Sequence, residues 1–203
     1  MRIISGNAKG KKIFEPNDIA TRPLKDLTKE SIFNILTHTN KFKVQIKDSN
    51  VLDLFSGVGS FGLECLSRGS AFVTFVENYD AVLPILKKNI YNLEYQNNSL
   101  VLEKNIFKNL NFNIFNKKFD IIFMDPPYKL KSISSLLDAI VESKILKKDG
   151  IVIIHRHKKE EDNYTKNFEI IELKKYGISK IVFGIFNYFN IFFVSFFINS
   201  TDG

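Results

Sequence analysis

The chain has 203 residues, which is the length of one ordinary domain that can bury a full apolar core. Its 29 Lys and Arg outnumber its 22 Asp and Glu, and the formal net charge of +7 favours a polyanionic partner. The single cysteine, Cys65, excludes an intramolecular disulfide and agrees with a reducing, cytoplasmic compartment. The first residues carry neither a signal-peptide apolar core nor a transit-peptide pattern.

Residues 1–14 alternate apolar and polar side chains around glycines, a pattern that predicts a small hairpin. Its basic side chains precede the first acid, Glu15, and they form either a solvated edge or an arm that contacts phosphates. Charge alone leaves both interpretations open. The predicted nucleic-acid contacts are Arg2, Lys9, Lys11 and Lys12 of this hairpin, together with Arg22 and Lys129 further along the chain.

A helix is predicted from Asp26, which can cap it, to Leu36, and a lysine-rich connection follows. Strands then alternate with helices, which predicts an α/β fold with a mostly parallel sheet. The last two strands are joined by a short turn at Tyr176-Gly177 and should pair antiparallel at one edge. The expected strands are 51–55, 71–76, 99–103, 119–124, 150–155, 168–173 and 180–186, and the expected helices are 60–68, 79–91 and 132–145.

The C-terminal stretch 181–198 is apolar enough to reach the lower length limit of a membrane helix. Asn187 and Asn190 interrupt it, phenylalanine replaces leucine, and no basic cluster flanks it, so spanning is disfavoured. We expect a final core strand followed by an apolar tail, residues 187–203, and no membrane partner.

A glycine-rich turn follows the strand 51–55, where Gly57, Gly59 and Gly62 spell G-x-G-x-x-G. Glu77 ends the next strand, where an acid can bind a ribose, so a nicotinamide-dependent oxidoreductase is a rival interpretation. Asp53 argues against it, because a carboxylate beside the turn repels a pyrophosphate by several kcal/mol in order of magnitude. The cationic ammonium and sulfonium of S-adenosylmethionine instead suit Asp53. A glycine turn without a ligand explains neither acid.

The cofactor-binding residues are assigned by their places along this edge. Asp53 should face the ammonium, Glu77 should accept the ribose hydroxyls, and Asn78 should lie beside the adenine. Asn105 and Ile106 follow the third strand near the adenine, although a plain loop explains Asn105 equally well. The full predicted set is Asp53, Phe55, Ser56, Gly57, Gly59, Ser60, Glu77, Asn78, Asn105, Ile106 and Asp125.

The tetrapeptide Asp125-Pro126-Pro127-Tyr128 directly follows the apolar strand 119–124. Proline cannot donate to the ladder, so the strand ends there and the carboxylate lies at the sheet edge where ligands bind. A bare Asp-Pro pair is typical of a stiff turn. The full tetrapeptide resembles the catalytic motif of S-adenosylmethionine-dependent methyltransferases that modify exocyclic amines of bases.

Several further stretches carry a more specific resemblance. They are Met-Arg-Ile-Ile-Ser-Gly at 1–6 with Lys9-Gly10, Thr-Arg-Pro at 21–23, Lys-Glu-Ser-Ile-Phe-Asn-Ile-Leu at 29–36, Leu-Asp-Leu-Phe-Ser-Gly at 52–57, Val76-Glu77 and Tyr176-Gly177. With the tetrapeptide, they make the chain up to about residue 186 resemble the RsmD family of 16S ribosomal RNA guanine-N2 methyltransferases. Leu24 and the pair Thr28-Lys29 depart from the family pattern, which concerns RNA contacts rather than chemistry.

The resemblance implies a Rossmann-like class I methyltransferase fold with a seven-stranded sheet, and S-adenosylmethionine as cofactor. We expect an N-terminal extension that covers RNA and cofactor (1–40), a catalytic domain (41–186) and the tail (187–203). The implied activity is methyl transfer to the N2 amine of a guanine in ribosomal RNA or the small ribosomal subunit, by a monomer.

The expected catalytic residues are Asp125, Pro126 and Tyr128. An aromatic amine is a poor nucleophile, and Asp125 with the Pro126 carbonyl can accept its hydrogens and stabilise the developing cation. Tyr128 should stack on the extruded base. His155 and His157 form an isolated H-x-H, interpreted as structural or phosphate-facing, and no metal is expected.

Other classes remain as alternatives. A DNA adenine-N6 methyltransferase shares the tetrapeptide and the glycine turn, but it usually carries a separate recognition domain that 203 residues do not accommodate. A protein-amine methyltransferase would favour Asn in place of Asp125. A non-enzymatic RNA-binding module needs only the basic hairpin and leaves Asp53, Glu77 and Asp125 unexplained.

Overall fold

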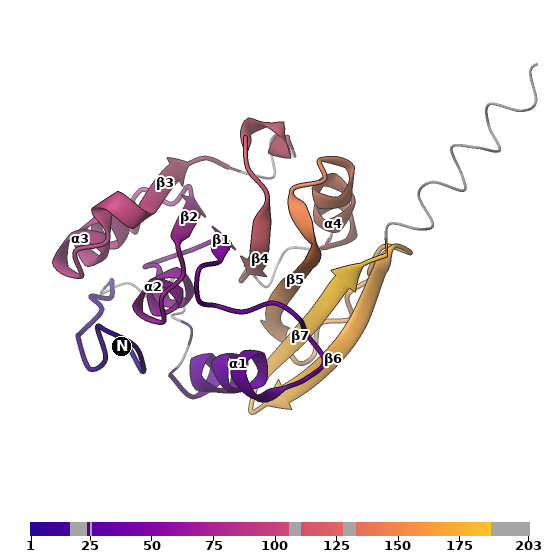
Figure 1. The fold of residues 1–203 in the computed structure, drawn as a ribbon, viewed down its shortest axis with the longest axis horizontal. Helices are drawn as coiled ribbons and strands as arrows, with labels where there is room; N and C mark the ends of the chain where they lie inside the picture. Colours follow the sequence, from indigo (N-terminus) through magenta and orange to yellow (C-terminus); the bar gives the residue numbers. More distant parts are fainter. Residues whose placement is uncertain (17–23, 25, 106–110, 128–132, 188–203) are drawn as a thin grey trace, which may run out of the picture.

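The computed structural model describes residues 1–16, 24, 26–105, 111–127 and 133–187. Its centre is a seven-stranded sheet with helices on both faces (Figure 1). The strands lie in the order β3-β2-β1-β4-β5-β7-β6. Their bounds are β1 (Asn50–Leu54), β2 (Phe72–Glu77), β3 (Ser99–Glu103), β4 (Phe119–Met124), β5 (Leu146–His157), β6 (Phe168–Tyr176) and β7 (Ser179–Phe186).

The pairing confirms the predicted mostly parallel sheet with an antiparallel edge. Strands β3, β2, β1, β4 and β5 are mutually parallel, whereas β7 is antiparallel to both β5 and β6. β5 starts at Leu146 rather than at the predicted residue 150. Leu146 pairs with Phe119, and a register shift between Phe119 and Ile121 keeps the exposed residues 147–149 within the strand.

The helices also follow the prediction, with shifted ends. α3 begins at Leu83 instead of residue 79, because Pro84 occupies the first turn, where a missing N–H does no harm. α4 ends at Glu142 because Lys144 adopts a left-handed backbone, with φ 50°, that a helix cannot continue. The described helices are α1 (Asp26–His38), α2 (Ser60–Ser67), α3 (Leu83–Asn92) and α4 (Ile133–Glu142), with short 3-10 turns η1 (Gln96–Asn98) and η2 (Phe112–Ile114).

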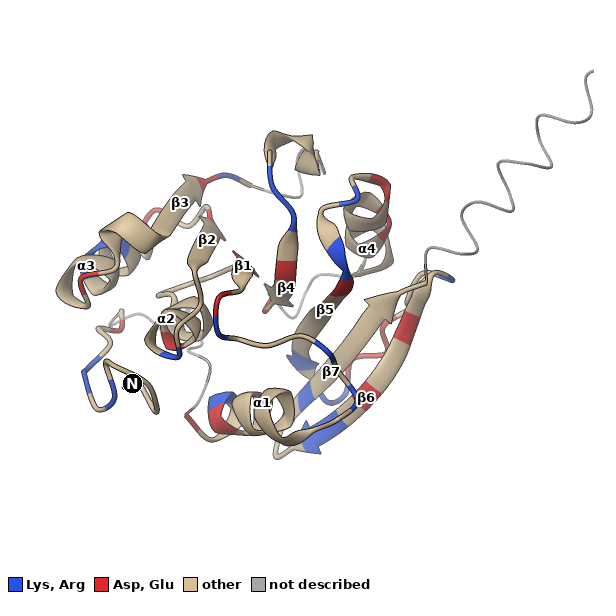
Figure 2. Ribbon diagram, in the orientation of Figure 1, with Lys and Arg blue, Asp and Glu red and all other residues tan. Residues whose placement is uncertain are grey.

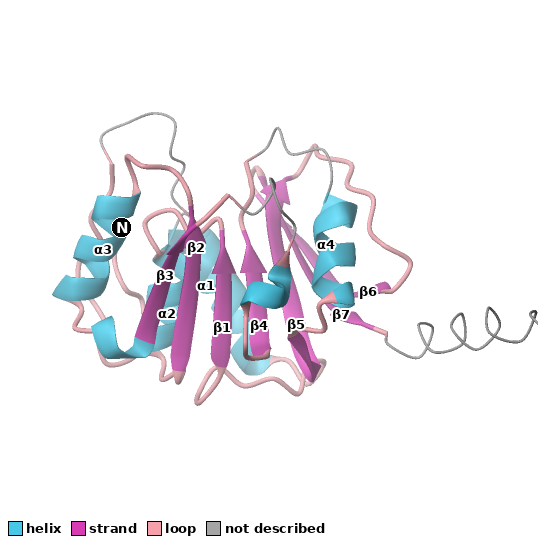
Figure 3. Cartoon of the chain, turned by 90° about the horizontal axis from the view of Figure 1, so that it is seen from above, coloured by secondary structure: helices cyan, strands magenta, loops and turns pink. Residues whose placement is uncertain are grey.

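Alternating residues of the strands build two cores, one on each face of the sheet. Helices α1, α2 and α3 cover one face and α4 covers the other, so the molecule has three layers (Figure 3). On the first face Phe61 of α2 stacks on Phe33 of α1 and on Phe123 of β4, with ring centroids 5.2 and 4.0 Å apart. α1 of the N-terminal extension therefore shares the core of the main sheet.

The predicted N-terminal hairpin is present, although its two arms meet in one isolated bridge between Arg2 and Lys12. The hairpin lies directly on α2. A Cβ on Gly6 would come within 1.7 Å of the Ser67 carbonyl oxygen, so only glycine allows this approach. The Asn7 amide donates to the same carbonyl at 2.8 Å.

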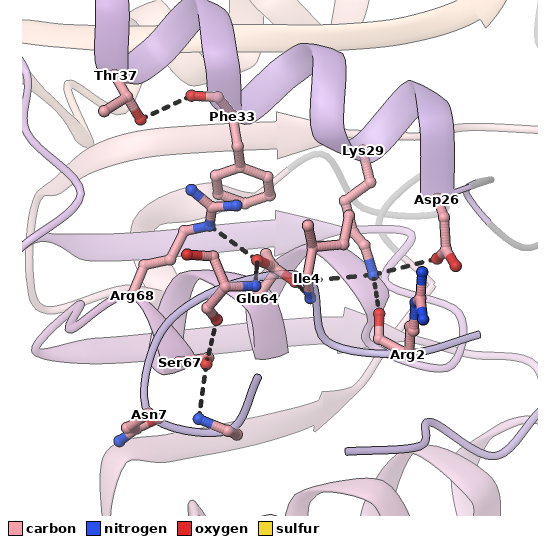
Figure 4. A network of polar contacts seen from close by, with 12 residues as sticks. Arg2, Ile4, Asn7, Asp26, Lys29, Phe33, Thr37, Glu64, Ser67 and Arg68 are labelled. Carbon is pink, nitrogen blue, oxygen red and sulfur yellow. Dashed lines mark hydrogen bonds and ion pairs between the residues drawn. The ribbon is translucent and has the colours of Figure 1, made fainter. Parts of the chain in front are cut away.

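A buried polar network fastens the hairpin to α1 and α2 (Figure 4). Glu64 of α2 is fully buried and accepts hydrogen bonds from the backbone amides of Ile4 and Ser5 at 2.8 and 2.9 Å. Arg68 Nε donates to the same carboxylate at 2.8 Å. The buried Lys29 ammonium of α1 lies 3.8 Å from Glu64 and donates to a hairpin carbonyl.

The C-terminal prediction is tested only in part. Residues 181–186 form the expected final strand within β7, and the tail beyond Asn187 lies outside the described residues. In the described part of the chain, no helix combines the length and the apolar character that crossing a membrane requires.

Candidate active site

Three carboxylates come together at the carboxyl ends of the central parallel strands. Asp53 lies in β1, Glu77 ends β2, and Asp125 follows β4. Because Leu54 pairs with both Val76 and Met124, the residues at these three strand ends are neighbours across the sheet. The charges of Asp125 and Glu77 both act on Asp53. The topology therefore produces one acidic crevice edge from three separate stretches of sequence.

The glycine-rich turn leaves β1 through an unusual backbone. Phe55 has a φ of 61°, a left-handed conformation that is uncommon for a bulky residue and marks a constrained turn. Gly57 and Gly59 follow with φ values of 55° and 85°. No atom lies within 4 Å of the position of a Cβ on Gly57, whereas one on Gly59 would press on Leu86 at 2.6 Å. Gly57 thus leaves open space beside its backbone, and Gly59 permits close packing where α2 begins.

Asp53 has one satisfied and one unsatisfied carboxylate oxygen. It is 1% exposed, and its Oδ2 accepts a hydrogen bond from the Gly62 amide at 3.0 Å. Its Oδ1 is buried and has no hydrogen-bond partner among the described residues. Burial raises the pKa of Asp53 well above its usual value; the charges of Asp125 and Glu77 raise it further, and the Gly62 amide opposes them. Such a carboxylate suits a cationic ligand group.

Glu77 is fixed against the glycine turn by backbone amides. Its Oε2 accepts from Gly57 at 2.7 Å, and its Oε1 accepts from Asn78 and Tyr79 at 2.8 and 2.9 Å. Carboxylate oxygens have further lone pairs, so the predicted bonds from ribose hydroxyls remain chemically available. Asn78 and Asn105 are both exposed at this edge.

One buried amide joins the N-terminal hairpin to the glycine turn. Asn89 of α3 is 1% exposed, and its Oδ1 accepts from the Phe14 amide at 2.8 Å. Its Nδ2 donates at 3.0 Å both to the Phe14 carbonyl and to the Val58 carbonyl within the turn. The outgoing arm of the hairpin therefore lies beside the predicted cofactor crevice.

Asp125 has a histidine partner that the sequence did not reveal. Its Oδ1 lies 2.8 Å from Nδ1 of His155, and Nε2 of His155 lies 2.9 Å from the Ser179 hydroxyl. His155 and Ser179 are each 7% exposed. The register that pairs Met124 with Ile154 brings the next residues of β4 and β5 together. The pairing of Asp125 with His155 could have been predicted only from the register of β4 and β5, and no local sequence pattern reveals that register.

Arg156, the next residue of β5, was also missed. It is 1% exposed, and its Nη1 donates to the Pro127 carbonyl at 3.2 Å. Its Nε donates to Asp162 at 2.9 Å, and the Lys180 ammonium lies 2.9 Å from the other oxygen of Asp162. Consecutive side chains of β5 thus hold two sides of the Asp125-Pro126-Pro127 segment.

The other predicted site residues fall into three groups. Ser56 and Ser60 are buried in the glycine turn, and the Ser60 hydroxyl has no hydrogen-bond partner among the described residues. The hairpin residues Arg2, Lys9, Lys11 and Lys12 are exposed and form a basic cluster (Figure 2). Four predicted residues lie outside the described part of the chain, namely Arg22, Ile106, Tyr128 and Lys129.

A cavity of about 420 Å³ lies away from this crevice. It opens at the amino ends of β1, β4 and β5, between residues 43–49 and 147–150. Neither the glycine turn nor Asp125 lines it. Within the described ranges, no three His, Cys, Asp or Glu side chains gather closely enough to hold a metal ion.

Comparison with known proteins finds a matching family profile and proteins of similar sequence. The family profile described as "Conserved hypothetical protein 95" matches residues 1–185. The ribosomal RNA small subunit methyltransferase D of Buchnera aphidicola subsp. Acyrthosiphon pisum is 33% identical over 172 residues, which cover 85% of this chain and 86% of that protein. The putative rRNA methyltransferase YlbH of Bacillus subtilis is 31% identical over a match that covers 89% of this chain and 96% of the length of YlbH.

Solved structures share the whole fold. The structure titled "Putative methyltransferase yhhF from Escherichia coli" matches with a TM-score of 0.75 at 26% identity. The match covers 91% of this chain and 96% of that one. The three-layer arrangement described above is therefore that of a methyltransferase fold.

Proposed function

Because this chain belongs to the family described as Conserved hypothetical protein 95, we propose that it methylates the exocyclic N2 amine of a guanine in small-subunit ribosomal RNA. The chain is an S-adenosylmethionine-dependent methyltransferase, as the names of its relatives and its fold indicate. The RNA substrate is proposed because two relatives are named for ribosomal RNA. The N2 amine is proposed because Asp125-Pro126-Pro127-Tyr128 resembles the tetrapeptide of base-amine methyltransferases.

The observation that carries this proposal is the meeting of Asp53, Glu77 and Asp125 at one sheet edge. The buried, unpartnered Oδ1 of Asp53 fits a ligand cation, and the open space at Gly57 fits close approach of a ligand to the backbone. Asp53, Gly57 and Glu77 would hold S-adenosylmethionine. When bound, this cofactor supplies a methyl group activated by its positively charged sulfur.

The protein's own contribution to the reaction comes from Asp125 and Pro126. The guanine amine is a poor nucleophile because its lone pair is delocalised into the ring. Its nitrogen gains positive charge as it bonds to the methyl carbon in exchange for the sulfur–methyl bond, and it loses a proton after the transfer. The Asp125 carboxylate and the Pro126 carbonyl are acceptors that can bond its two hydrogens and stabilise that charge. The His155 bond uses one lone pair of Oδ1 of Asp125, so Oδ2 is the less occupied oxygen and the one we assign to the amine. Positioning by the rigid Pro126-Pro127 segment supplies further rate enhancement.

The alternatives fit the site less well. A dinucleotide would bring its pyrophosphate to an edge lined by three carboxylates, where electrostatic repulsion opposes it. A DNA adenine-N6 methyltransferase could use the same tetrapeptide, but the relatives are named for ribosomal RNA. A non-enzymatic RNA-binding module leaves the acidic crevice without a role.

The decisive experiment uses small ribosomal subunits and naked 16S RNA that lack the modification, with labelled S-adenosylmethionine. We expect labelled N2-methylguanosine after nucleoside digestion and mass spectrometry. Asp125→Ala should lower the rate about 100- to 1,000-fold, as expected when a group that stabilises developing charge is removed. Cofactor affinity, measured by calorimetry, should change little.

Asp138→Ala is the matched control, because this exposed aspartate of α4 lies outside the crevice and should leave the rate unchanged. A different product nucleoside, such as N6-methyladenosine, would contradict the guanine assignment. Wild-type turnover by Asp125→Ala would contradict the assigned role of the carboxylate.

A further inference from the structure

The backbone around the catalytic carboxylate is rigid, but it leaves the side-chain rotamer of Asp125 unrestrained. Asp125 follows the last residue of β4, and its amide makes a long bond of 3.4 Å to the Leu54 carbonyl. Its side chain is 22% exposed at the crevice. An aspartate in such a place can occupy several rotamers. Productive geometry therefore requires a partner that selects one of them.

His155 supplies that partner from the neighbouring strand. Its ring is almost fully buried, and its Nδ1 contacts Oδ1 of Asp125 at 2.8 Å. An ionised carboxylate only accepts hydrogen bonds, so Nδ1 must carry the proton in this contact. In the neutral ring Nε2 is then an acceptor, and the Ser179 hydroxyl at 2.9 Å can donate to it. The two partners together select one tautomer and one ring orientation.

Ser179 connects this pair to the antiparallel edge of the sheet. It is the first residue of β7, directly after the turn that joins β6 to β7. β7 also pairs with β5 along the residues that carry His155. The backbone of Ser179 is therefore paired with both β5 and β6, which keeps its hydroxyl within reach of the His155 ring.

We propose that His155, oriented by Ser179, is a positioning residue that holds Asp125 with Oδ1 occupied and Oδ2 presented to the substrate amine. This inference rests on the proposed function, since it assigns Asp125 to the amine. Beyond that function, the inference specifies the tautomer of His155, with the proton on Nδ1. It also makes catalysis depend on the hydrogen bond between Ser179 of β7 and Nε2 of His155.

The test compares four single variants at saturating RNA, with the concentration of S-adenosylmethionine varied so that kcat and KM are obtained separately. His155→Leu removes both ring bonds and should lower kcat about 10- to 100-fold, with the KM for S-adenosylmethionine within about twofold of wild type. His155→Asn keeps an N–H near the position of Nδ1 and should restore most of the lost rate. Ser179→Ala should lower kcat about 3- to 10-fold because the ring loses its orienting donor.

Asp138→Ala again serves as the control, because this exposed aspartate of α4 lies outside the crevice and should leave kcat near wild type. Equal loss in His155→Leu and His155→Asn would overturn the proposal, and so would a His155→Leu rate within twofold of wild type. If His155→Leu fails to fold, the His155→Asn and Ser179→Ala rates still decide, since unchanged Ser179→Ala turnover overturns the orienting role.

A second measurement separates this inference from the proposed function. The ring nitrogens of His155 can be assigned by 15N NMR in the cofactor-free protein, without RNA. We expect the proton to be on Nδ1 in the wild-type protein. In Asp125→Ala we expect this preference for Nδ1 over Nε2 to be lost. A protonated Nε2 in the wild-type protein would overturn the inference even if guanine methylation is found. The expected tautomer would stand even if the methylated product proves to be another base.

Discussion

Asp53 has opposite consequences for folding and for ligand binding. Its carboxylate is buried with one oxygen unpartnered, and burial raises its pKa well above the ordinary value. Because the folded-state pKa exceeds the unfolded one, the protonated form is favoured in the folded protein. Stability from this residue is complete below pH about 4 and is lost as the pH rises through the folded pKa.

Asp53→Asn should therefore stabilise the cofactor-free protein and weaken cofactor binding. The amide carries no ionisable group, so folding no longer has to bury a carboxylate charge or bind a proton, and we expect a gain of about 1–3 kcal/mol in the free energy of unfolding by urea titration at pH 7. Calorimetry should show S-adenosylmethionine binding about 10- to 100-fold more weakly. Cofactor affinity should rise with pH in the wild-type protein, and this dependence should vanish in the variant.

Asp120→Asn is the control for this experiment. Asp120 lies at the opposite end of β4, where it accepts from the Asn50 amide and pairs with Lys147. Cofactor affinity should not change in this variant. An Asp53→Asn protein that binds the cofactor as tightly as wild type would exclude the assigned contact with the ammonium.

Among single residues, the sequence pointed to those whose proposed role can be inferred from the residues next to them in the chain. Asp53 and Asp125 were identified because each lies beside a diagnostic stretch, the glycine turn or the double proline. His155 was interpreted as structural or phosphate-facing, because its partner is 30 residues away and meets it only through the register of β4 and β5. Arg156 was missed because an arginine is seldom fully buried.

Among the elements, α1, α2 and the N-terminal hairpin behave as one unit around Glu64 and Lys29. Both side chains are fully buried, and burial lowers the pKa of Lys29 while Glu64 and Asp26 oppose that change. Glu64 also receives three donors from the hairpin and Arg68. The sequence predicted each element separately, yet a buried lysine and glutamate are rare enough that their pairing could not be inferred.

Removing the two partners should have unequal effects. Glu64→Gln removes the fully buried anion of Lys29 and leaves its ammonium with the more exposed carboxylate of Asp26 at 3.7 Å, so it should lower the free energy of unfolding by about 3–5 kcal/mol. Lys29→Met leaves Glu64 with its three donors and should have a smaller effect, about 1–2 kcal/mol. Urea unfolding of both variants and of the double variant measures the coupling. Equal losses would show that the pair does not act as described.

For the whole molecule, the alternation of strands and helices gave the fold correctly because each element has its own periodicity. The antiparallel edge was predicted from the short connection before Ser179, whereas the order of the strands in the sheet came only from the structure. The distribution of charged side chains over the surface could not be predicted from the sequence and is known only from the structure. It separates the basic cluster of the hairpin from the lysines around the cavity at the amino ends of the strands.

Replacing Lys9, Lys11 and Lys12 together by Gln should weaken RNA binding and make it less sensitive to salt. Each lost phosphate contact should reduce the slope of log affinity against log salt by about 0.7 to 0.9. Filter binding from low to physiological salt measures this slope, while cofactor affinity should remain unchanged. The same change of charge at Lys43, Lys47 and Lys148 is the control, because these exposed lysines line the distant cavity. Identical slopes in the two triple variants would argue against an RNA-binding hairpin.

The side-chain amide of Asn89 connects the two regions that are proposed to contact RNA and S-adenosylmethionine. This one planar group forms hydrogen bonds with Phe14 in the hairpin arm and with Val58 in the glycine turn. If RNA binding shifts this arm, we expect the glycine turn that is proposed to hold the cofactor to shift with it. Thermodynamic reciprocity then requires that cofactor occupancy alter RNA affinity by the same factor, so the two substrates cannot bind independently wherever that shift occurs.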